Sequence, residues 1–243
     1  MRRMVLLREQ VREGTLLVVN RQHPLRSSQK IELINVGNGV QMERHAAAAF
    51  NECVRLVGGR ETIVPVSGWR SAQEQKKIWD DTMRKEGACF TESYVAHPGC
   101  SEHQTGLAID LGKAAESIDF IRPDFPQEGV CRAFRTQSVR WGFVQRYRAH
   151  KRQQTGIAEE PWHFRYVGAP HAQILESRDL CLEEYSDFLK QGPVNLELGG
   201  VQATVFYVPE SGAKTVADVP DGLVQVSGDN CGGFILTVWR WRA

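Results

Sequence analysis

The fold of this chain is decided by residues 101–110, which read Ser101-Glu102-His103-Gln104-Thr105-Gly106-Leu107-Ala108-Ile109-Asp110. From Leu107 onward, apolar residues alternate with small or polar ones. This period of two predicts a half-buried strand that carries Asp110 on its less apolar face. Glycine tolerates turn geometry, so the chain is expected to bend at Thr105-Gly106, just before the strand.

The bend matters because His103 and Asp110 are both candidate metal ligands. On one straight strand they would lie about 23 Å apart, and on one helix about 10 Å apart along the axis. Zinc holds such ligand atoms at about 2.0–2.2 Å. A bend between the two residues is therefore the simplest way to bring both side chains to one ion.

A second segment, Glu160-Pro161-Trp162-His163, supplies the other candidates. The aromatic and β-branched residues from Trp162 to Val167 predict a strand, and Pro161 favours an extended Glu160. Two histidines, an aspartate and a free glutamate are the components of a catalytic zinc site with an open position for water. The alternative is that these are ordinary polar residues, since a lone histidine is more often structural than a ligand.

The two segments together resemble the signature of the zinc D-alanyl-D-alanine peptidases of the VanX and VanY type, SxHxxGxAxD followed by ExxWH. Every signature position matches, namely Ser101, His103, Gly106, Ala108, Asp110, Glu160, Trp162 and His163. The resemblance implies an α+β fold with a central, largely antiparallel sheet and flanking helices, as in D,D-peptidases and the hedgehog signalling domain. It also implies one Zn2+ per chain on His103, Asp110 and His163, with Glu160 as the catalytic base.

A further candidate, Arg70, lies between a strand expected over residues 63–69 and a helix. Ser71-Ala72-Gln73-Glu74 is a capping box, so the helix is expected to start at Ser71 and run to Glu86. By spacing alone Arg70 would be a surface salt-bridge residue. The resemblance implies instead that Arg70 contacts substrate and the developing oxyanion, and that Gln75, Ser101 and Trp162 bind substrate.

The implied reaction is removal of the C-terminal D-alanine from a peptidoglycan stem peptide or muramyl-pentapeptide precursor, in cell-wall remodelling or glycopeptide resistance. The residues within and around both segments resemble those of the carboxypeptidase branch and favour a VanY-type carboxypeptidase. An L,D-carboxypeptidase and a VanX-type D-Ala-D-Ala dipeptidase are the alternatives within this class. The alternative of a different class is a non-catalytic zinc-binding module, which would be expected to lack Glu160.

Composition and charge narrow the partners and the cellular location expected for this protein. The 243 residues are 42% hydrophobic and 24% charged with a formal charge of +1, so nucleic acid is not an expected partner. No apolar run reaches the roughly 18 residues of a membrane span, and residues 1–7 are too short for a signal peptide. The chain as written is expected to be cytoplasmic, or in the cell envelope if an N-terminal anchor is missing.

Two domains are expected. Gly192-Pro193 marks a change of character, which predicts a catalytic domain over 1–191 and a small C-terminal all-β unit over 192–243. Asp229 to Gly233 is the strongest hairpin signal in that unit.

Residues 87–99 and the basic run 146–152 are predicted to be loops, the latter solvated. The six cysteines form no CxxC pair, and free thiols are favoured over a Cys89–Cys100 disulfide.

Overall fold

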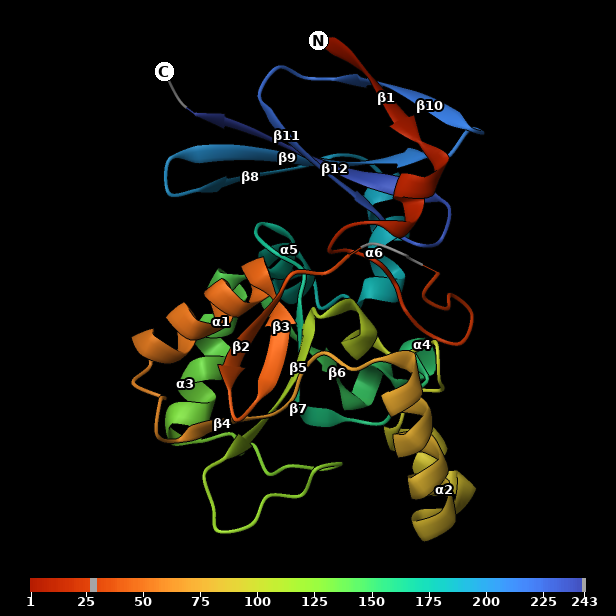
Figure 1. Ribbon diagram of the computed structural model, residues 1–243. Helices are drawn as coiled ribbons and strands as arrows, with labels where there is room; N and C mark the ends of the chain where they lie inside the picture. The colour runs from red at the N-terminus through yellow and green to blue at the C-terminus, as the bar shows by residue number, and fades with distance from the viewer. Residues whose placement is uncertain (27–29, 242–243) are drawn as a thin grey trace. The chain divides into compact units, whose positions relative to one another are not determined.

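The computed structural model describes residues 1–26 and 30–241, and their contacts form two compact units (Figure 1). One unit contains residues 19–25 and 30–181. The other contains Met1–Val18, Arg26 and residues 182–241. Helices accompany antiparallel sheets in the first unit and strands dominate the second, so the expected α+β class with a C-terminal β unit is confirmed.

The first unit is built on a four-stranded sheet in which every neighbouring pair is antiparallel. Its strand order is β4-β5-β7-β6, with β4 at one edge as expected for a strand that contains Pro65. The strands are β4 (Ile63–Ser67), β5 (Ala108–Lys113), β7 (Glu160–Tyr166) and β6 (Phe143–Tyr147).

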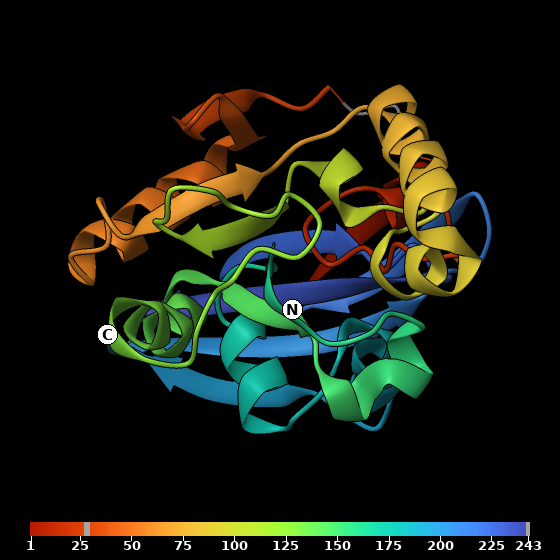
Figure 2. The same cartoon turned by 90° about the horizontal axis from the view of Figure 1, so that it is seen from below.

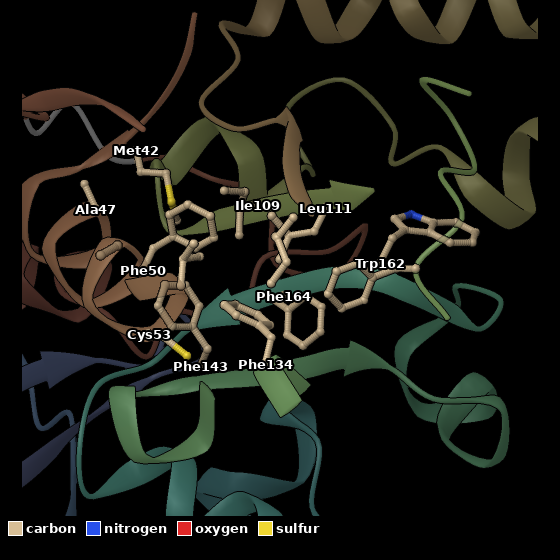
Figure 3. Packing of buried hydrophobic residues seen from close by; sticks show 14 of the residues in the cluster. Met42, Ala47, Phe50, Cys53, Ile109, Leu111, Phe134, Phe143, Trp162 and Phe164 are labelled. Carbon is tan, nitrogen blue, oxygen red and sulfur yellow. The ribbon is translucent and has the colours of Figure 1, made fainter. Parts of the chain in front are cut away.

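The strands of this sheet alternate in character, and the alternation separates the core from the site. Ile109 and Leu111 on β5 and Phe164 on β7 are fully buried in the hydrophobic core (Figure 3). Helices α1 (Arg44–Leu56) and α3 (Gly129–Ser138) contribute to the same core. Because successive strand residues point to opposite faces, Asp110 and His163 project from the other face of the sheet.

Helix α2 (Ala72–Tyr94) begins at the predicted capping box, in which Ser71 and Glu74 satisfy each other's free backbone groups. It lies toward the opposite end of its unit from α1 (Figures 1 and 2). The loop predicted from Gly87 is wrong for residues 88–94, which remain helical. Gly87 has φ of 79° and interrupts the helix, but the Thr91 hydroxyl donates to the Gly87 carbonyl and the chain resumes its helical course.

The remaining elements of the first unit are short. A hairpin of β2 and β3 precedes α1, and one-turn helices join the later strands. Their bounds are β2 (Leu33–Gly37), β3 (Val40–Glu43), η2 (Glu102–Thr105), η3 (Val139–Trp141), η4 (Ala149–Lys151), α4 (Arg152–Thr155) and α5 (His171–Ser177). Among the described residues, no helix combines the length and apolar character needed to cross a bilayer.

The second unit holds a four-stranded antiparallel sheet of order β11-β12-β9-β8 and a separate pair, β1 with β10. Its elements are β1 (Arg2–Leu7), η1 (Arg8–Arg12), α6 (Leu182–Lys190), β8 (Val194–Leu198), β9 (Val201–Pro209), β10 (Lys214–Val219), β11 (Leu223–Gly228) and β12 (Gly233–Trp241). The predicted hairpin turn joins β11 to β12. There the Asp229 Oδ1 accepts the backbone N–H groups of Cys231, Gly232 and Gly233.

The residues that form this unit are not those expected from a division of the chain after residue 191. The first eighteen residues group with the C-terminal strands, because β1 pairs with β10 and Leu6 is buried in their core. Helix α6 groups there as well. Such a pairing joins residues more than two hundred positions apart and leaves no local pattern. All six cysteines lie in the described part of the chain and are free.

Candidate metal centre

Three different elements bring the predicted ligands together. His103 lies on η2, which ends at Gly106 with a left-handed φ of 72°, so the predicted bend is present. Asp110 on β5 stands directly opposite His163 on β7 in the strand register. Asp110 Oδ2 is 3.1 Å from His103 Nε2, and Asp110 Oδ1 is 2.9 Å from His163 Nδ1. One ligand atom from each residue lies within 4.8 Å of the others.

The second nitrogen of each imidazole also has a partner. His103 Nδ1 lies 2.7 Å from the Gly68 carbonyl, to which it donates. His163 Nε2 lies 3.4 Å from Glu102 Oε2. These outer partners leave Nε2 of His103 and Nδ1 of His163 as the nitrogens that face the centre. Metal-binding histidines are oriented in this way in known sites.

The donor set fits zinc. Two imidazole nitrogens and one carboxylate oxygen form a recognised three-ligand catalytic set that leaves a fourth position open. All three side chains are buried, and they form the one group of this kind found among residues 1–26 and 30–241. An aspartate between two histidines in a dry site is an arrangement that a divalent cation completes, since it supplies the positive charge that burial otherwise disfavours.

The charges of the three groups are strongly coupled. Burial alone would raise the pKa of Asp110, but the two histidines outweigh it and hold that pKa well below its ordinary value. Burial and Arg70 lower the pKa of His103 to about 4, against the opposing effect of Asp110. For His163 burial acts downward, yet its hydrogen bond to Asp110 and the surrounding carboxylates raise the pKa to about 9. The aspartate is therefore the anionic anchor of the centre.

Glu160 stands beside the ligands but is not one of the three. It is the first residue of β7, is 5% exposed, and places Oε2 at 3.7 Å from His163 Nδ1. Burial is the largest influence on its carboxyl and raises the pKa to about 8. Asp110 adds to this rise, while His163 and Arg70 oppose it. A carboxylate with a raised pKa is a stronger proton acceptor than an ordinary glutamate.

Arg70 lies between β4 and α2, as expected. Its side chain is only 15% exposed and its Nη2 is 3.7 Å from Asp110 Oδ2, so the surface position inferred from spacing alone is wrong. Burial lowers its pKa, and the neighbouring Asp110 and Glu160 raise it again. Its Nε is buried and has no hydrogen-bond partner among the described residues, which leaves a donor available at the site.

The three predicted substrate contacts line the same pocket as the ligands, Glu160 and Arg70. Gln75 is 1% exposed and donates to the Ala96 carbonyl, which leaves its Oε1 buried without a partner among the described residues. Ser101 is also 1% exposed. Trp162 lines the pocket, and it also belongs to the hydrophobic core (Figure 3). All eight residues named from the sequence therefore meet in one pocket.

Sequence reasoning missed a charged cluster beneath this pocket. Arg146 was expected in a solvated loop, but it lies on β6, is 3% exposed and donates from Nε to Glu102 Oε1 at 2.8 Å. Arg165 pairs with the same oxygen at 2.9 Å. Tyr147 lines the pocket with its ring 4.9 Å from that of His163. The one local signal was position, since Glu102 adjoins His103 and Arg165 lies two residues beyond His163 on the same strand.

Comparison with known proteins identifies relatives that belong to the family suggested by the sequence signature. Residues 39–169 match the VanY family, described as D-alanyl-D-alanine carboxypeptidase. The bifunctional D-Ala-D-Ala dipeptidase and D-Ala-D-Ala carboxypeptidase VanXYC of Enterococcus gallinarum is 39% identical over 183 residues. That alignment covers 73% of this chain and 96% of VanXYC.

Solved structures agree. The vancomycin resistance D,D-dipeptidase VanXYg, in complex with a D-Ala-D-Ala phosphinate analogue, superposes with a TM-score of 0.94 at 41% identity and covers 98% of this chain and 99% of its own. A mutant of the D,D-pentapeptidase VanY from a VanB-type cassette, in complex with Zn(II), superposes at 0.61 with 31% identity over 71% of this chain and 99% of its own. From the signature residues, the antiparallel sheet and these matches, the chain belongs to the VanY family of D-alanyl-D-alanine carboxypeptidases.

Proposed function

We propose that this protein is a zinc-dependent carboxypeptidase that removes the C-terminal D-alanine from peptidoglycan stem peptides or their muramyl-pentapeptide precursors. One observation carries the proposal. One pocket presents a His-Asp-His ligand set, a glutamate of raised pKa and an arginine whose Nε has no hydrogen-bond partner within the described part of the chain. The activities for which VanXYC and VanXYg are named, both on D-Ala-D-Ala, support the choice of substrate class.

In this proposal His103 Nε2, Asp110 and His163 Nδ1 hold one Zn2+. A bound ion would supply Lewis acidity at the scissile carbonyl and would favour deprotonation of the attacking water. Glu160 Oε2 takes the proton of the attacking water and delivers it to the leaving amine of D-alanine.

The arginine and the substrate contacts have separate roles. Arg70 donates to the oxygen on which negative charge develops as the carbonyl is attacked, and a donor prepositioned in a dry site is most effective there. The unpaired Oε1 of Gln75 accepts an N–H of the peptide, which relieves the cost of a buried, unsatisfied acceptor. Ser101 and Trp162 complete the wall against which the terminal residue rests.

A second candidate activity is hydrolysis of free D-Ala-D-Ala dipeptide. The VanXYg dipeptidase covers 98% of this chain at 41% identity, and VanXYC is a bifunctional D-Ala-D-Ala dipeptidase and carboxypeptidase. The two activities differ only in what precedes the scissile bond, so one pocket with one terminal D-alanine subsite serves both. We therefore regard dipeptide hydrolysis as a companion activity of the same site.

We further propose that catalysis belongs to the unit formed by residues 19–25 and 30–181, with the β unit auxiliary. Every residue of the site lies in the unit formed by residues 19–25 and 30–181.

The test is to incubate the purified protein with three substrates and identify products by mass spectrometry. These are a muramyl pentapeptide ending in D-Ala-D-Ala, a tetrapeptide ending in an L,D bond, and the D-Ala-D-Ala dipeptide. We expect a mass loss of one alanine from the pentapeptide and free alanine from the dipeptide. Cleavage of the tetrapeptide alone would replace the proposal with an L,D-carboxypeptidase. A zinc-loaded protein that cleaves none of the three is a binding module.

A further inference from the structure

Behind the His163 ring lies a buried carboxylate that the proposed chemistry does not use. Glu102 is 1% exposed. Its Oε1 accepts a hydrogen bond from Arg146 Nε at 2.8 Å and forms an ion pair with Arg165 Nη1 at 2.9 Å. Its Oε2 lies 3.4 Å from His163 Nε2. The two oxygens of one carboxylate thus face different partners.

Pairing with the arginines does not explain why Oε2 lies against His163. A carboxylate that serves only a buried arginine is best matched in a bidentate pair that uses both of its oxygens. Here both arginines come to Oε1, so Oε2 is available to the imidazole. The opposite nitrogen of that imidazole, Nδ1, is 2.9 Å from Asp110 Oδ1. The His163 ring is therefore clamped between two carboxylates.

We infer that Glu102 is a positioning residue for the metal centre, which holds the proton of His163 on Nε2 and thereby presents the Nδ1 lone pair as the ligand. This inference rests on the proposed zinc site. A carboxylate that accepts the outer N–H of a ligating histidine fixes its tautomer and orientation and increases its basicity. On the other side of the ring, Nδ1 of His163 faces Asp110, which is another of the proposed metal ligands.

The two histidines of the centre are distinguished by this contact. His103 donates its outer N–H to a neutral acceptor, the Gly68 carbonyl, whereas His163 has a carboxylate. A change at Glu102 should therefore act on His163 and leave the orientation of His103 intact. Arg146 from β6 and Arg165 from β7 anchor Glu102 from two strands, so the carboxylate is held by a network and not by a single flexible contact.

The test compares Glu102→Gln, which keeps the shape but removes the charge, with Glu102→Asp, which keeps the charge for the arginines but withdraws the oxygen from His163. Glu43→Gln is the matched control, since that glutamate caps α1 through the backbone N–H groups of His45 and Ala46. Zinc dissociation constants are measured by competition with a chromogenic chelator. Histidine-selective nitrogen NMR of the zinc-loaded proteins reports the His163 Nε2–H.

We expect both Glu102 variants to bind zinc about 10–100-fold more weakly, with a shifted and faster-exchanging His163 Nε2–H, while the His103 signal and the control stay at wild-type values. Wild-type affinity in both variants overturns the inference. So does an affinity loss with an unchanged His163 signal, because that pattern reports general loosening of the fold. If Glu102→Gln does not fold, Glu102→Asp decides alone. A wild-type protein that binds no zinc refutes the metal site itself, which separates the two failures.

Discussion

The role proposed for Glu160 is tested most sharply by Glu160→Gln, which preserves size and hydrogen-bonding atoms but removes the base. The carboxyl is 5% exposed beside His163 and is not needed to complete the ligand set. Zinc content should therefore remain at one per chain. We expect kcat to fall by about 10²–10⁴-fold, the range of general acid–base catalysis, which corresponds to about 3–5 kcal/mol of transition-state stabilisation.

The same substitution should stabilise the metal-free protein. Burial raises the pKa of Glu160 from 4.5 to about 8, so between these pH values the folded state holds a proton that the unfolded state has released. The free energy of unfolding then falls as pH rises, by about 1.4 kcal/mol per pH unit from this group. Glutamine carries no such penalty. Metal-free Glu160→Gln should therefore be more stable than wild type by about 3 kcal/mol at pH 7.

The pH–rate profile gives a third signature. The base acts in its ionised form, so kcat/KM of the wild type should rise with pH as Glu160 loses its proton and level off above its pKa. A bound cation and Arg70 favour the ionised form, which places this rise below pH 8. In Glu160→Gln the residual activity should lack this acid limb, since the carboxyl of Glu160 is no longer present to titrate.

The assay measures zinc by mass spectrometry, kinetics on the muramyl pentapeptide and urea unfolding on the same preparations. Glu159→Gln is the matched control, because it makes the same chemical change at the exposed neighbouring residue. It should retain wild-type kcat and stability. Loss of zinc from Glu160→Gln would show that Glu160 is a ligand. Nearly full activity with an unchanged acid limb would assign the base to another residue.

Three further predictions concern the ligands, the domains and pH. His163→Ala should lose zinc after dialysis, whereas His45→Ala on the exposed start of α1 should keep it; retained stoichiometric zinc would refute the ligand assignment. A protein of residues 19–181 should keep zinc and pentapeptide hydrolysis, and a folded, zinc-loaded but inactive product would show that the β unit helps to bind substrate. Burial lowers the pKa of His171 from 6.5 to about 3, so its neutral form stabilises the fold above pH 6.5 and that stability is lost as pH falls. The loss should reach about 2 kcal/mol by pH 5, and urea unfolding of His171→Leu between pH 7 and 5 should lack this part of the slope.

Sequence alone determined the features that depend on neighbouring residues. The period of two after Gly106 predicted β5, and the capping box Ser71 to Glu74 predicted the start of α2. Both signals act within a few residues, through the pleat of a strand and the free N–H groups of a helix end. The spacing of His103 and Asp110 required a bend for the same local reason, and the bend is present.

Tertiary structure decided which charges are buried and which distant strands pair. Arg146 appeared solvated among basic neighbours, yet its burial depends on Glu102, a residue 44 positions away. The pairing of β1 with β10 depends on strands at opposite ends of the chain. No short-range pattern encodes either contact. Burying Arg146 is favourable only once Glu102 has been brought within hydrogen-bonding distance, and only the folded chain brings these two side chains together.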